Sequence, residues 1–525
     1  MIDPGSLVAL MAAAATSPHA VLDVRERGPY EKGHIFRATS LPRRQLETRL
    51  PGLVTAPTTP IVLVDEDGSL AELARPTLAD MGYRDVRVLR GGVRGWRAEG
   101  RRLVQGFNVP SKVFGERMLH EMNTPEVSCE ELDRRMKAGA DFVLVDSRTP
   151  EEYHRACIPG AVSMPGAELV LRIRDLAPSP QTIVVVNCAG RTRSIIGAQS
   201  LINAGVPNKV VALRNGTMGW TLAGLACESG KARRAPTVSP AGLAWAKSAA
   251  AGVAARFGIT RIDRATLERW RADGGRTLYL LDVRDSGEYA AGHVAGALSA
   301  PGGQLVQATD QYVGTLGARI VLVDDAEVRA VMTASWLRQM GWADVFVLAE
   351  AGGETGWPAP AVLGPAPDPA LCIDVGGLAA LLARDAATVV DLSLSRDYLK
   401  AHIPDAWFAI RSRLARAFAA VPLRGTLVLT SEDGVLAGLA AGEAQALVDT
   451  PVRVLEGGNA AWLAAGHALT ADDPRMADDA VDTWLKPYER AKDTTQAMQD
   501  YLSWEVDLLA RIERDGTARF AQARS

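Results

Sequence analysis

Cysteine is scarce in this sequence, and long apolar runs are absent. Only five cysteines occur in 525 residues, and no two of them show a CxxC spacing. An odd number of cysteines without that spacing argues against a disulfide framework and against a cysteine zinc site. No apolar run approaches the length of a membrane span. The formal net charge is only −3, so electrostatics gives no reason to expect nucleic acid or an acidic membrane surface as a partner.

The composition is otherwise that of an ordinary globular protein, with 47% hydrophobic and 23% charged residues. The length is sufficient for several domains. An apolar stretch near the start, Leu7 to Ala15, lacks the basic flank of a signal peptide and leads into a strand-like segment from His19 to Arg25. We therefore expect the apolar stretch to be the first helix of a domain, and the protein to be cytoplasmic.

One cysteine stands where chemistry is expected. The β-branched run from Ile183 to Val186 predicts a buried strand, Cys188 follows it, and a helical pattern begins at Ser194. Backbone amides of such a turn and the positive end of the helix dipole favour an anion, and Arg191 and Arg193 add positive charge. These conditions lower a thiol's pKa and favour a nucleophilic thiolate. The alternative is a buried structural cysteine, which would not require two nearby arginines.

Two sequence motifs recur four times along the chain. Each unit has an aspartate near a strand end, with a tyrosine and usually a histidine soon after it. Each unit also closes with a glycine-rich segment that carries a tryptophan. The aspartates are Asp23, Asp146, Asp282 and Asp391, and the tryptophans are Trp96, Trp220, Trp357 and Trp462. Strand and helix patterns alternate within each unit, which predicts an α/β fold with parallel sheets.

The loop from Cys188 to Arg193 resembles the active-site loop of the rhodanese family of sulfurtransferases, and the two repeated motifs resemble the flanking motifs of that family. In this family a cysteine begins a six-residue loop closed by a basic or hydroxyl residue. Related dual-specificity phosphatases have a loop one residue longer, which fits phosphate, so the shorter loop favours sulfur transfer. Gly190 departs from many single-domain members, which have their glycine one position later. This departure bears on the substrate more than on the reaction class.

The resemblance implies four tandem rhodanese-like domains, each a parallel sheet flanked by helices, and a helical C-terminal tail. The expected domains are residues 1–106, 123–230, 258–360 and 370–472, with the tail at 473–525. Linkers are expected at residues 107–124, 230–240 and 358–369, and a helical stretch at 241–257. Only the second domain has the catalytic cysteine. For the tail we expect no more than a packing role.

The other three units have no cysteine at the corresponding loop. Counting from the glycine that ends the following helix, or from the strand end in the fourth unit, places Asp65, Asp324 and Ser431 at the position of Cys188. Carboxylates cluster in all three loops, and they would repel an anionic sulfur donor. We expect these units to be inactive toward thiosulfate and to serve as scaffold, to shape the second unit's site or to dock a partner.

The implied reaction begins with attack of the Cys188 thiolate on the outer sulfur of thiosulfate, and cyanide or a thiol then accepts the sulfur. The substrate-binding residues would be Ala189, Gly190, Arg191, Thr192, Arg193 and Ser194. Asp146 and Arg148 would support the site, although a strand-end pair of this kind often has only a structural role. Two loop arginines favour thiosulfate over the alternative donor, 3-mercaptopyruvate. The alternative function is a non-catalytic or sulfur-relay scaffold that binds partner proteins.

No cofactor or metal is required by this reading, and no nucleic acid or membrane partner is expected; the oligomeric state is left open. Cys157 replaces the histidine found at His34, His293 and His402 in the other units. It could be a resolving thiol, but a small apolar filler is the favoured interpretation. The remaining cysteines lack a basic neighbourhood and are assigned no chemistry; they are Cys129, Cys227 and Cys372.

Overall fold

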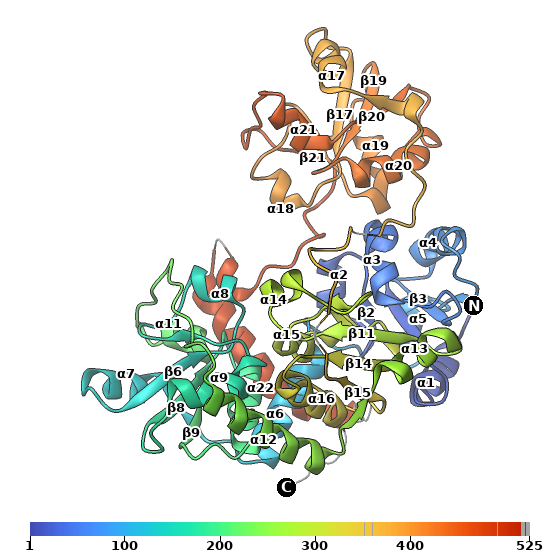
Figure 1. Ribbon diagram of the computed structural model, residues 1–525. Helices are drawn as coiled ribbons and strands as arrows, with labels where there is room; N and C mark the ends of the chain where they lie inside the picture. The colour runs from blue at the N-terminus through green and yellow to red at the C-terminus, as the bar shows by residue number, and fades with distance from the viewer. Residues whose placement is uncertain (351, 360, 491, 516–519, 521–525) are drawn as a thin grey trace.

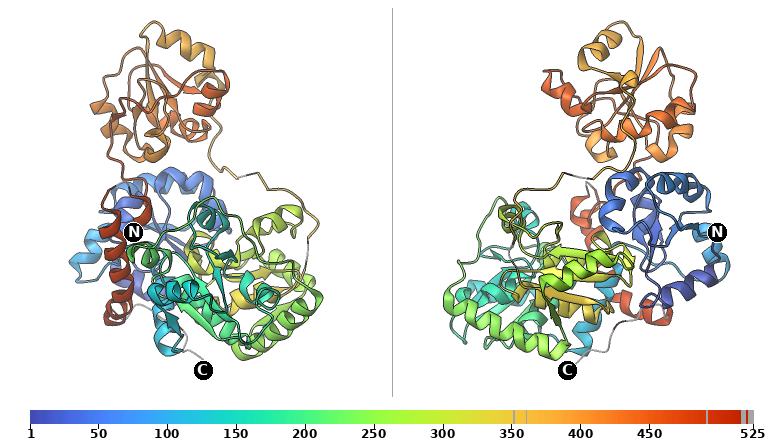
Figure 2. Two further views of the ribbon diagram at one scale, coloured as in Figure 1. Left: turned by 90° about the vertical axis from the view of Figure 1, so that its left-hand side faces the viewer. Right: turned by 45° about the vertical axis from the view of Figure 1, so that its right-hand side comes forward.

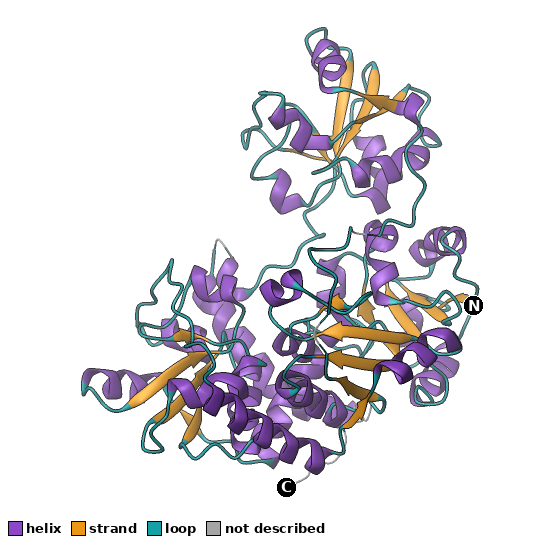
Figure 3. Ribbon diagram, viewed as in Figure 1, coloured by secondary structure: helices purple, strands orange, loops and turns teal. Residues whose placement is uncertain are grey.

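The computed structural model describes residues 1–350, 352–359, 361–490, 492–515 and 520. The described residues contain four β-sheets, one for each repeated unit, and helices flank each sheet (Figures 1 and 3). The expected fold class, tandem α/β units with parallel sheets and a helical tail, is confirmed. The expected ends of the third domain, at residue 360, and of the tail, at residue 525, lie outside the described residues. Among the described helices, none has both the length and the apolar character to cross a membrane.

The second unit contains five parallel strands in the order β5-β9-β8-β6-β7. Their bounds are β5 Glu126–Val127, β9 Val210–Leu213, β8 Ile183–Asn187, β6 Phe142–Asp146 and β7 Val162–Ser163. The helices are α7 (Cys129–Lys137), α8 (Pro150–Arg155), α9 (Glu168–Leu176), α10 (Thr192–Asn203) and α11 (Gly216–Leu222). Because parallel strands end at one edge of a sheet, the residues after β6 and β8 lie side by side, and Cys188 is among them.

The first and third units have the same plan. The first contains β1 (His19–Asp23), β2 (Thr39–Ser40), β3 (Ile61–Val64), β4 (Val86–Val88), α1 (Pro4–Ala12), α2 (Arg27–Lys32), α3 (Leu46–Leu53), α4 (Ser69–Asp80) and α5 (Gly92–Ala98). The third contains β10 (Thr260–Ile262), β11 (Leu278–Asp282), β12 (Leu298–Ser299), β13 (Thr315–Leu316), β14 (Arg319–Val323), β15 (Val345–Leu348), α13 (Arg264–Asp273), α14 (Ser286–Ala291), α15 (Gly302–Gln307) and α16 (Val328–Gln339). Strand β13 leaves its own unit and pairs antiparallel with β1, which joins the two units.

The fourth unit lies apart from the others, at the top of Figure 1. Its strands are β16 (Cys372–Ile373), β17 (Ala387–Asp391), β18 (Trp407–Phe408), β19 (Thr426–Thr430), β20 (Val452–Leu455) and β21 (Arg475–Met476). Its helices are α17 (Val375–Leu382), α18 (Ser395–Tyr398), α19 (Leu414–Ala420), α20 (Val435–Gln445) and α21 (Gly458–Ala464). Strand β21 pairs with β18, so the sheet continues past residue 472, where the sequence repeat ends. Arg411 reaches the first unit and lies 2.7 Å from Glu47.

The closing segment of the third unit departs from the repeat. In the other units the tryptophan lies on a short helix, α5, α11 or α21, and is buried. Trp357 lies in no helix, is 59% exposed, and has its ring centroid 4.9 Å from that of Tyr289. The same sequence motif therefore has a different structure in this unit. Among its described residues the closing segment forms no short helix, and Glu354 instead bridges to His293.

The second and third units share one hydrophobic core. Helix α12 (Pro240–Phe257), expected as a helical stretch, packs against α9 and α16 and closes the gap between the two sheets. The buried side chains between them include Leu169, Ala250 and Val331. Because protein interiors are close-packed, this shared core fixes the orientation of the third unit relative to the edge of the second unit's sheet at which Cys188 lies.

Two segments outside the sheets pack against each other beside the second unit. The expected linker at residues 107–124 forms helix α6 (Val109–Glu121), which packs against α10. The second segment is the tail. After the fourth unit the chain returns to the lower part of the molecule, where α22 (Thr494–Asp515) lies along α6 and contacts α11 (Figures 1 and 2). The linker and the tail thus both border the loop that contains Cys188.

Candidate active site

Cys188 lies at the carboxyl end of β8 and begins the loop into α10. Its side chain is 2% exposed, and its thiol donates to Ser194 Oγ at 3.5 Å. The preceding residue, Asn187, donates from Nδ2 to Asp146 Oδ2 at 3.0 Å, which ties β8 to β6 beside the thiol. The cysteine therefore has a fixed position on a rigid element, as a nucleophile requires.

The glycine-rich closing segment of the second unit, from Asn215 to Trp220, donates hydrogen bonds to this loop. The amides of Thr217 and Met218 donate to the carbonyls of Cys188 and Ala189 at 2.9 and 3.0 Å. A Cβ at Gly216, whose φ is +53°, would lie 2.2 Å from the Cys188 carbonyl oxygen. Only glycine fits here, which gives the repeated motif a physical reason.

Burial raises the pKa of the Cys188 thiol above its ordinary value. Arg193 and the amide and hydroxyl of Ser194 act in the opposite direction, and Glu505 adds to the upward shift. The expectation that the loop lowers this pKa is therefore wrong, because desolvation outweighs the favourable groups. Arg193 and Ser194 nevertheless make the thiolate more stable than it would be if burial acted alone.

Arg193, the sixth residue of the loop, is held by a carboxylate. Its guanidinium lies 2.6 and 3.1 Å from the two oxygens of Glu152 and 3.2 Å from Gln304 Oε1 of the third unit. Lys486 Nζ and Tyr488 OH donate to the same glutamate at 2.9 and 3.2 Å. Burial disfavours the charge on Glu152, but Arg193 and Lys486 outweigh that penalty and hold its pKa well below the usual range.

Arg191 is paired in a similar way. Its Nε and Nη2 lie 2.6 and 2.9 Å from the two oxygens of Glu116 on α6, and Nη1 donates to Asn215 Oδ1 at 3.3 Å. Both members of the pair are buried. Neither loop arginine is thus a free cation facing the sulfur; both are held by carboxylates. Sequence reasoning missed Glu116 because it treated residues 107–124 as a linker.

Thr192 and Gly190 contact the tail. Thr192 Oγ1 donates to Glu505 Oε1 at 2.6 Å. A Cβ at Gly190 would lie 2.9 Å from the Met218 methyl carbon and 3.2 Å from Glu505 Oε2. The glycine therefore leaves room for the tail to sit close to the loop. Nothing in the local sequence indicates this contact, since Thr192 and Glu505 are 313 positions apart.

The supporting pair, Asp146 and Arg148, is buried and bidentate. Arg148 Nε and Nη2 donate to Asp146 at 2.9 and 2.7 Å, and Nη2 also donates to the Ala156 carbonyl at 2.6 Å. The same geometry recurs in two units without cysteine, at Asp23 with Arg25 and at Asp282 with Arg284. Because the pair recurs in those units, we favour a structural role for it in the second unit. There Asp146 is linked through Asn187 to the strand that precedes Cys188.

All five cysteines are free. Cys157 is fully buried among mostly apolar side chains of the second unit, with Arg233 Nη2 3.8 Å from its sulfur, and burial raises its pKa. In the other units the histidine at this place stacks on a tyrosine, as His34 does on Tyr30 with ring centroids 3.8 Å apart. This setting supports a packing role for Cys157. Within the described part of the chain, no group of three or more His, Cys, Asp or Glu side chains is arranged to hold a metal ion.

The corresponding loops of the first and third units are filled by their own aspartates. Asp65 accepts the amides of Gly68, Leu70 and Ala71 at 2.6, 2.7 and 3.1 Å. Asp324 accepts the amide of Arg329 at 2.7 Å and lies 3.1 Å from its guanidinium. A carboxylate thus occupies each amide nest that could otherwise bind a substrate anion.

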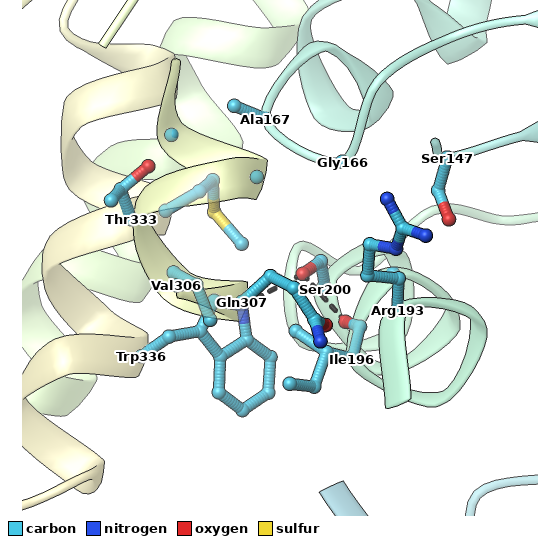
Figure 4. A pocket seen from close by; sticks show the side chains of 14 residues that line it. Ser147, Gly166, Ala167, Arg193, Ile196, Ser200, Val306, Gln307, Thr333 and Trp336 are labelled. Carbon is cyan, nitrogen blue, oxygen red and sulfur yellow. Dashed lines mark hydrogen bonds between the residues drawn. The ribbon is translucent and has the colours of Figure 1, made fainter. Parts of the chain in front are cut away.

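A narrow cavity between the second and third units reaches Arg193 (Figure 4). Ser147 and Arg193 lie on one side of it, and Val306 and Trp336 lie on the other. Trp336 Nε1 donates to Ser200 Oγ at 2.8 Å across the interface. Cys188 is not among the lining residues, so the cavity approaches the loop from its arginine side.

Comparisons with known proteins support the fold described above. A thiosulfate sulfurtransferase from Pseudomonas aeruginosa, known from its crystal structure, is 44% identical, with 99% of each chain covered and a TM-score of 0.95. A sulfurtransferase of Allochromatium vinosum is 31% identical over 100 residues, which are 19% of this chain and 91% of that protein.

The HTH-type transcriptional regulator Rv0324 of Mycobacterium tuberculosis is 34% identical over 111 residues, and the chain spans only about half (48%) of that relative's length. The Rhodanese-like domain matches residues 4–99, 128–223 and 263–358. The fourth sheet lies outside these segments. Because the three matched segments together span more than half of the chain's length, the chain belongs to the rhodanese-like domain family.

Proposed function

We propose that this protein transfers a sulfane sulfur from thiosulfate to a thiophilic acceptor through a persulfide on Cys188. The observation that carries the proposal is the placement of Cys188 at the start of the loop, with Arg193 and Ser194 favouring its thiolate. The similarity of the whole chain to a thiosulfate sulfurtransferase supports the same reaction.

The reaction divides into two displacements at sulfur. In the first, the Cys188 thiolate attacks the outer sulfur of thiosulfate, the sulfur–sulfur bond breaks, and sulfite leaves with the bonding electron pair. In the second, cyanide or a thiolate attacks the outer sulfur of the persulfide, and the Cys188 thiolate leaves. Electrons balance in each step without an oxidant, a metal or a cofactor.

The loop would stabilise the charge that moves through these steps. Arg193 and the amide and hydroxyl of Ser194 favour the anionic form of the sulfur. Arg193 acts electrostatically on the sulfur while Glu152 fixes its position. Arg191 and Thr192 shape the loop through Glu116 and Glu505, and the amides of Ala189 and Gly190 complete the proposed anion site. The donor's sulfonate would therefore be held mainly by backbone amides rather than by a free guanidinium.

The other units would act as scaffold, with the domain boundaries expected from the sequence except that the fourth unit extends past residue 472 to include β21. The third unit supports this role through Gln304, which reaches Arg193. The self-filled loops at Asp65 and Asp324 support the proposal that these units do not bind the donor. Free cysteines throughout are consistent with a reducing compartment, and we place the activity in the cytoplasm.

The test is the intact mass of the protein after incubation with thiosulfate, followed by addition of cyanide. We expect one added sulfur atom, absent in Cys188→Ala, and release of thiocyanate on addition of cyanide. No added sulfur from thiosulfate but one from 3-mercaptopyruvate would change the donor, and none from either would overturn the proposal. A stable persulfide that neither cyanide nor thiols discharge would favour the alternative, a sulfur-relay scaffold. The three units without a catalytic cysteine are the observation that favours this alternative.

A further inference from the structure

The tail contributes side chains to the proposed active site. Its contacts with the second unit include two near the Cys188 loop, one at Glu152, reached by Lys486 and Tyr488, and one at Thr192, reached by Glu505. Between them, Met498 and Leu502 pack on Met218, directly behind the Cys188 loop. The tail is therefore part of the wall around the catalytic cysteine.

The register of α22 fixes which of its side chains faces the loop. Met498, Leu502 and Glu505 are spaced three and four positions apart, so they lie on one helix face. The register is secured by Lys112 of α6, whose Nζ lies 4.6 Å from the ring centroids of both Tyr501 and Trp504. Glu505 thus reaches the loop from a rigid element rather than from a free chain end.

One oxygen of Glu505 has no partner. The side chain is 2% exposed, and Oε1 accepts from Thr192, but Oε2 has no hydrogen-bond partner among the described residues. This oxygen lies next to Gly190 of the Cys188 loop, 3.2 Å from where a Cβ on that glycine would stand. A buried carboxylate oxygen without a donor is costly, and the group that fits it is the N–H, O–H or S–H of a ligand.

The nearby cations do not satisfy this oxygen. Arg191 is engaged by Glu116 and Arg193 by Glu152. Lys112 has no ion pair within the described residues and is held by the two rings. Glu505 therefore presents an acceptor to whatever molecule approaches Cys188.

We propose that Glu505 is a catalytic base for thiol acceptors: it takes the proton of an incoming thiol while that sulfur attacks the Cys188 persulfide. The inference rests on the proposed function and specifies its acceptor class. A thiol carries the S–H that the free oxygen requires, whereas an anionic acceptor carries no such proton.

The step balances as follows. The thiol R–SH gives its proton to Glu505 Oε2, and the resulting R–S⁻ attacks the outer sulfur of Cys188–S–S⁻. The bond between the two persulfide sulfurs breaks, and its electron pair stays on Cys188 Sγ as the thiolate. The transferred sulfur leaves as R–S–S⁻ and recovers the proton from Glu505 as R–S–SH.

The same carboxylate has the opposite effect on the first half of the reaction. Thiosulfate is a dianion, and a negative charge beside the loop opposes its approach. Neutralising Glu505 should therefore speed persulfide formation and slow its discharge by a thiol. A residue with only a structural role would change both steps in the same direction.

The experiment uses Glu505→Gln in the full chain, because glutamine keeps the length of the side chain and an oxygen for Thr192. Persulfide formation from thiosulfate and discharge of the isolated persulfide are measured separately by intact mass over time. The acceptors are 2-mercaptoethanol, a neutral thiol, and sulfite, which has no S–H to give. The matched control is Glu489→Gln, since Glu489 lies on the same tail and pairs with the exposed Arg155.

We expect discharge by 2-mercaptoethanol to fall by about tenfold or more, whereas discharge by sulfite and persulfide formation should not fall. The control should behave as wild type. An unchanged thiol discharge, or an equal loss with both acceptors, would overturn the inference. If wild type takes no sulfur from thiosulfate, the proposed function fails separately, and the persulfide is then installed with inorganic polysulfide so that discharge can still be measured.

Discussion

Arg193 and Arg329 occupy equivalent places in the second and third units. Each stands at the start of the helix after its loop, and each binds a glutamate 41 positions earlier, Glu152 and Glu288, at 2.6 Å. The two differ in what lies at the first loop position, which is Cys188 in one unit and Asp324 in the other. Sequence comparison overlooked Arg329 because carboxylates surround it in the chain. The pair provides a matched experiment on what the arginine does for the thiol.

Arg193→Ala should lower the rate of persulfide formation by about tenfold, because the sulfur loses the guanidinium that favours its anion, and one charge-assisted contact corresponds to about 1.5–3 kcal/mol. Arg329→Ala removes the same kind of ion pair from a unit without cysteine and should leave that rate within about threefold of wild type. Rates come from intact mass, and thermal unfolding reports stability. Equal loss of activity in both variants would show that the arginine acts through stability alone.

Cys188→Ala should abolish transfer from thiosulfate to cyanide without unfolding the protein, because Cys188 begins the loop between β8 and α10, whereas Cys129, which follows β5, is the first residue of helix α7. Cys157→Ala is the matched control. Cys157 is buried among apolar side chains, so its loss should lower the free energy of unfolding by about 1 kcal/mol and leave transfer intact. Thiocyanate production and chemical denaturation measure the two effects. Loss of transfer in Cys157→Ala would assign that thiol a chemical role.

Ser194→Ala should shift the ionisation of Cys188 to higher pH. Burial already raises the pKa of this thiol, and the Ser194 hydroxyl opposes the shift, so its removal should raise the pKa further. Alkylation of Cys188 by iodoacetamide, followed on its peptide by mass spectrometry across a pH series, measures the change. The variant should react more slowly near neutral pH and reach the wild-type rate only at higher pH; coincident profiles would contradict this role.

The same pKa shift links pH to stability. The folded protein holds the Cys188 proton more tightly than the unfolded chain does, because the folded-state pKa is raised. Its contribution to stability is therefore present below the unfolded pKa of the thiol and is lost as pH rises above that value. The free energy of unfolding should fall less at alkaline pH in Cys188→Ala than in wild type.

Asp65→Cys on a Cys188→Ala background should not restore sulfur transfer. Asp65 fills its own amide nest, and its replacement leaves Glu66 and Asp67 beside the new thiol with no arginine at the sixth loop position. Replacing residues 65–70 with the loop of the second unit should give detectable persulfide.

Asp324→Cys on the same background is the informative comparison, because Arg329 is already present. We expect detectable persulfide from Asp324→Cys and none from Asp65→Cys, measured by intact mass after thiosulfate treatment. Greater labelling of Asp65→Cys would show that neither loop charge nor the arginine decides activity.

The sequence allowed the sheets and the position of the cysteine to be predicted, because these depend on local patterns. The run from Ile183 to Val186 becomes the central strand β8, and Cys188 follows it at the edge where parallel strands end. The helix expected at residues 241–257 is also present as α12. The different structure at Trp357 could not be predicted in this way, because its glycine-rich motif matches those that form a short helix in the other units.

The surroundings of the cysteine could not be predicted in the same way. Glu116, Gln304 and Glu505 come from a presumed linker, another unit and the tail, and each reaches the loop only through tertiary packing. The pKa of Cys188 depends on that packing, because burial by these segments outweighs the loop's own charges. A local sequence motif indicates which groups can ionise, but not how strongly burial desolvates them.

The contact between Thr192 and Glu505 has a consequence for biosynthesis. The two residues are 313 positions apart, so at a translation rate of about 5–20 residues per second the loop emerges from the ribosome roughly 15–60 s before the carboxylate that contacts it. During that interval the nascent second unit can fold around its sheet while its thiol still lacks the tail and the third unit as neighbours. Oxidation of Cys188 is therefore a hazard of synthesis more than of the finished protein.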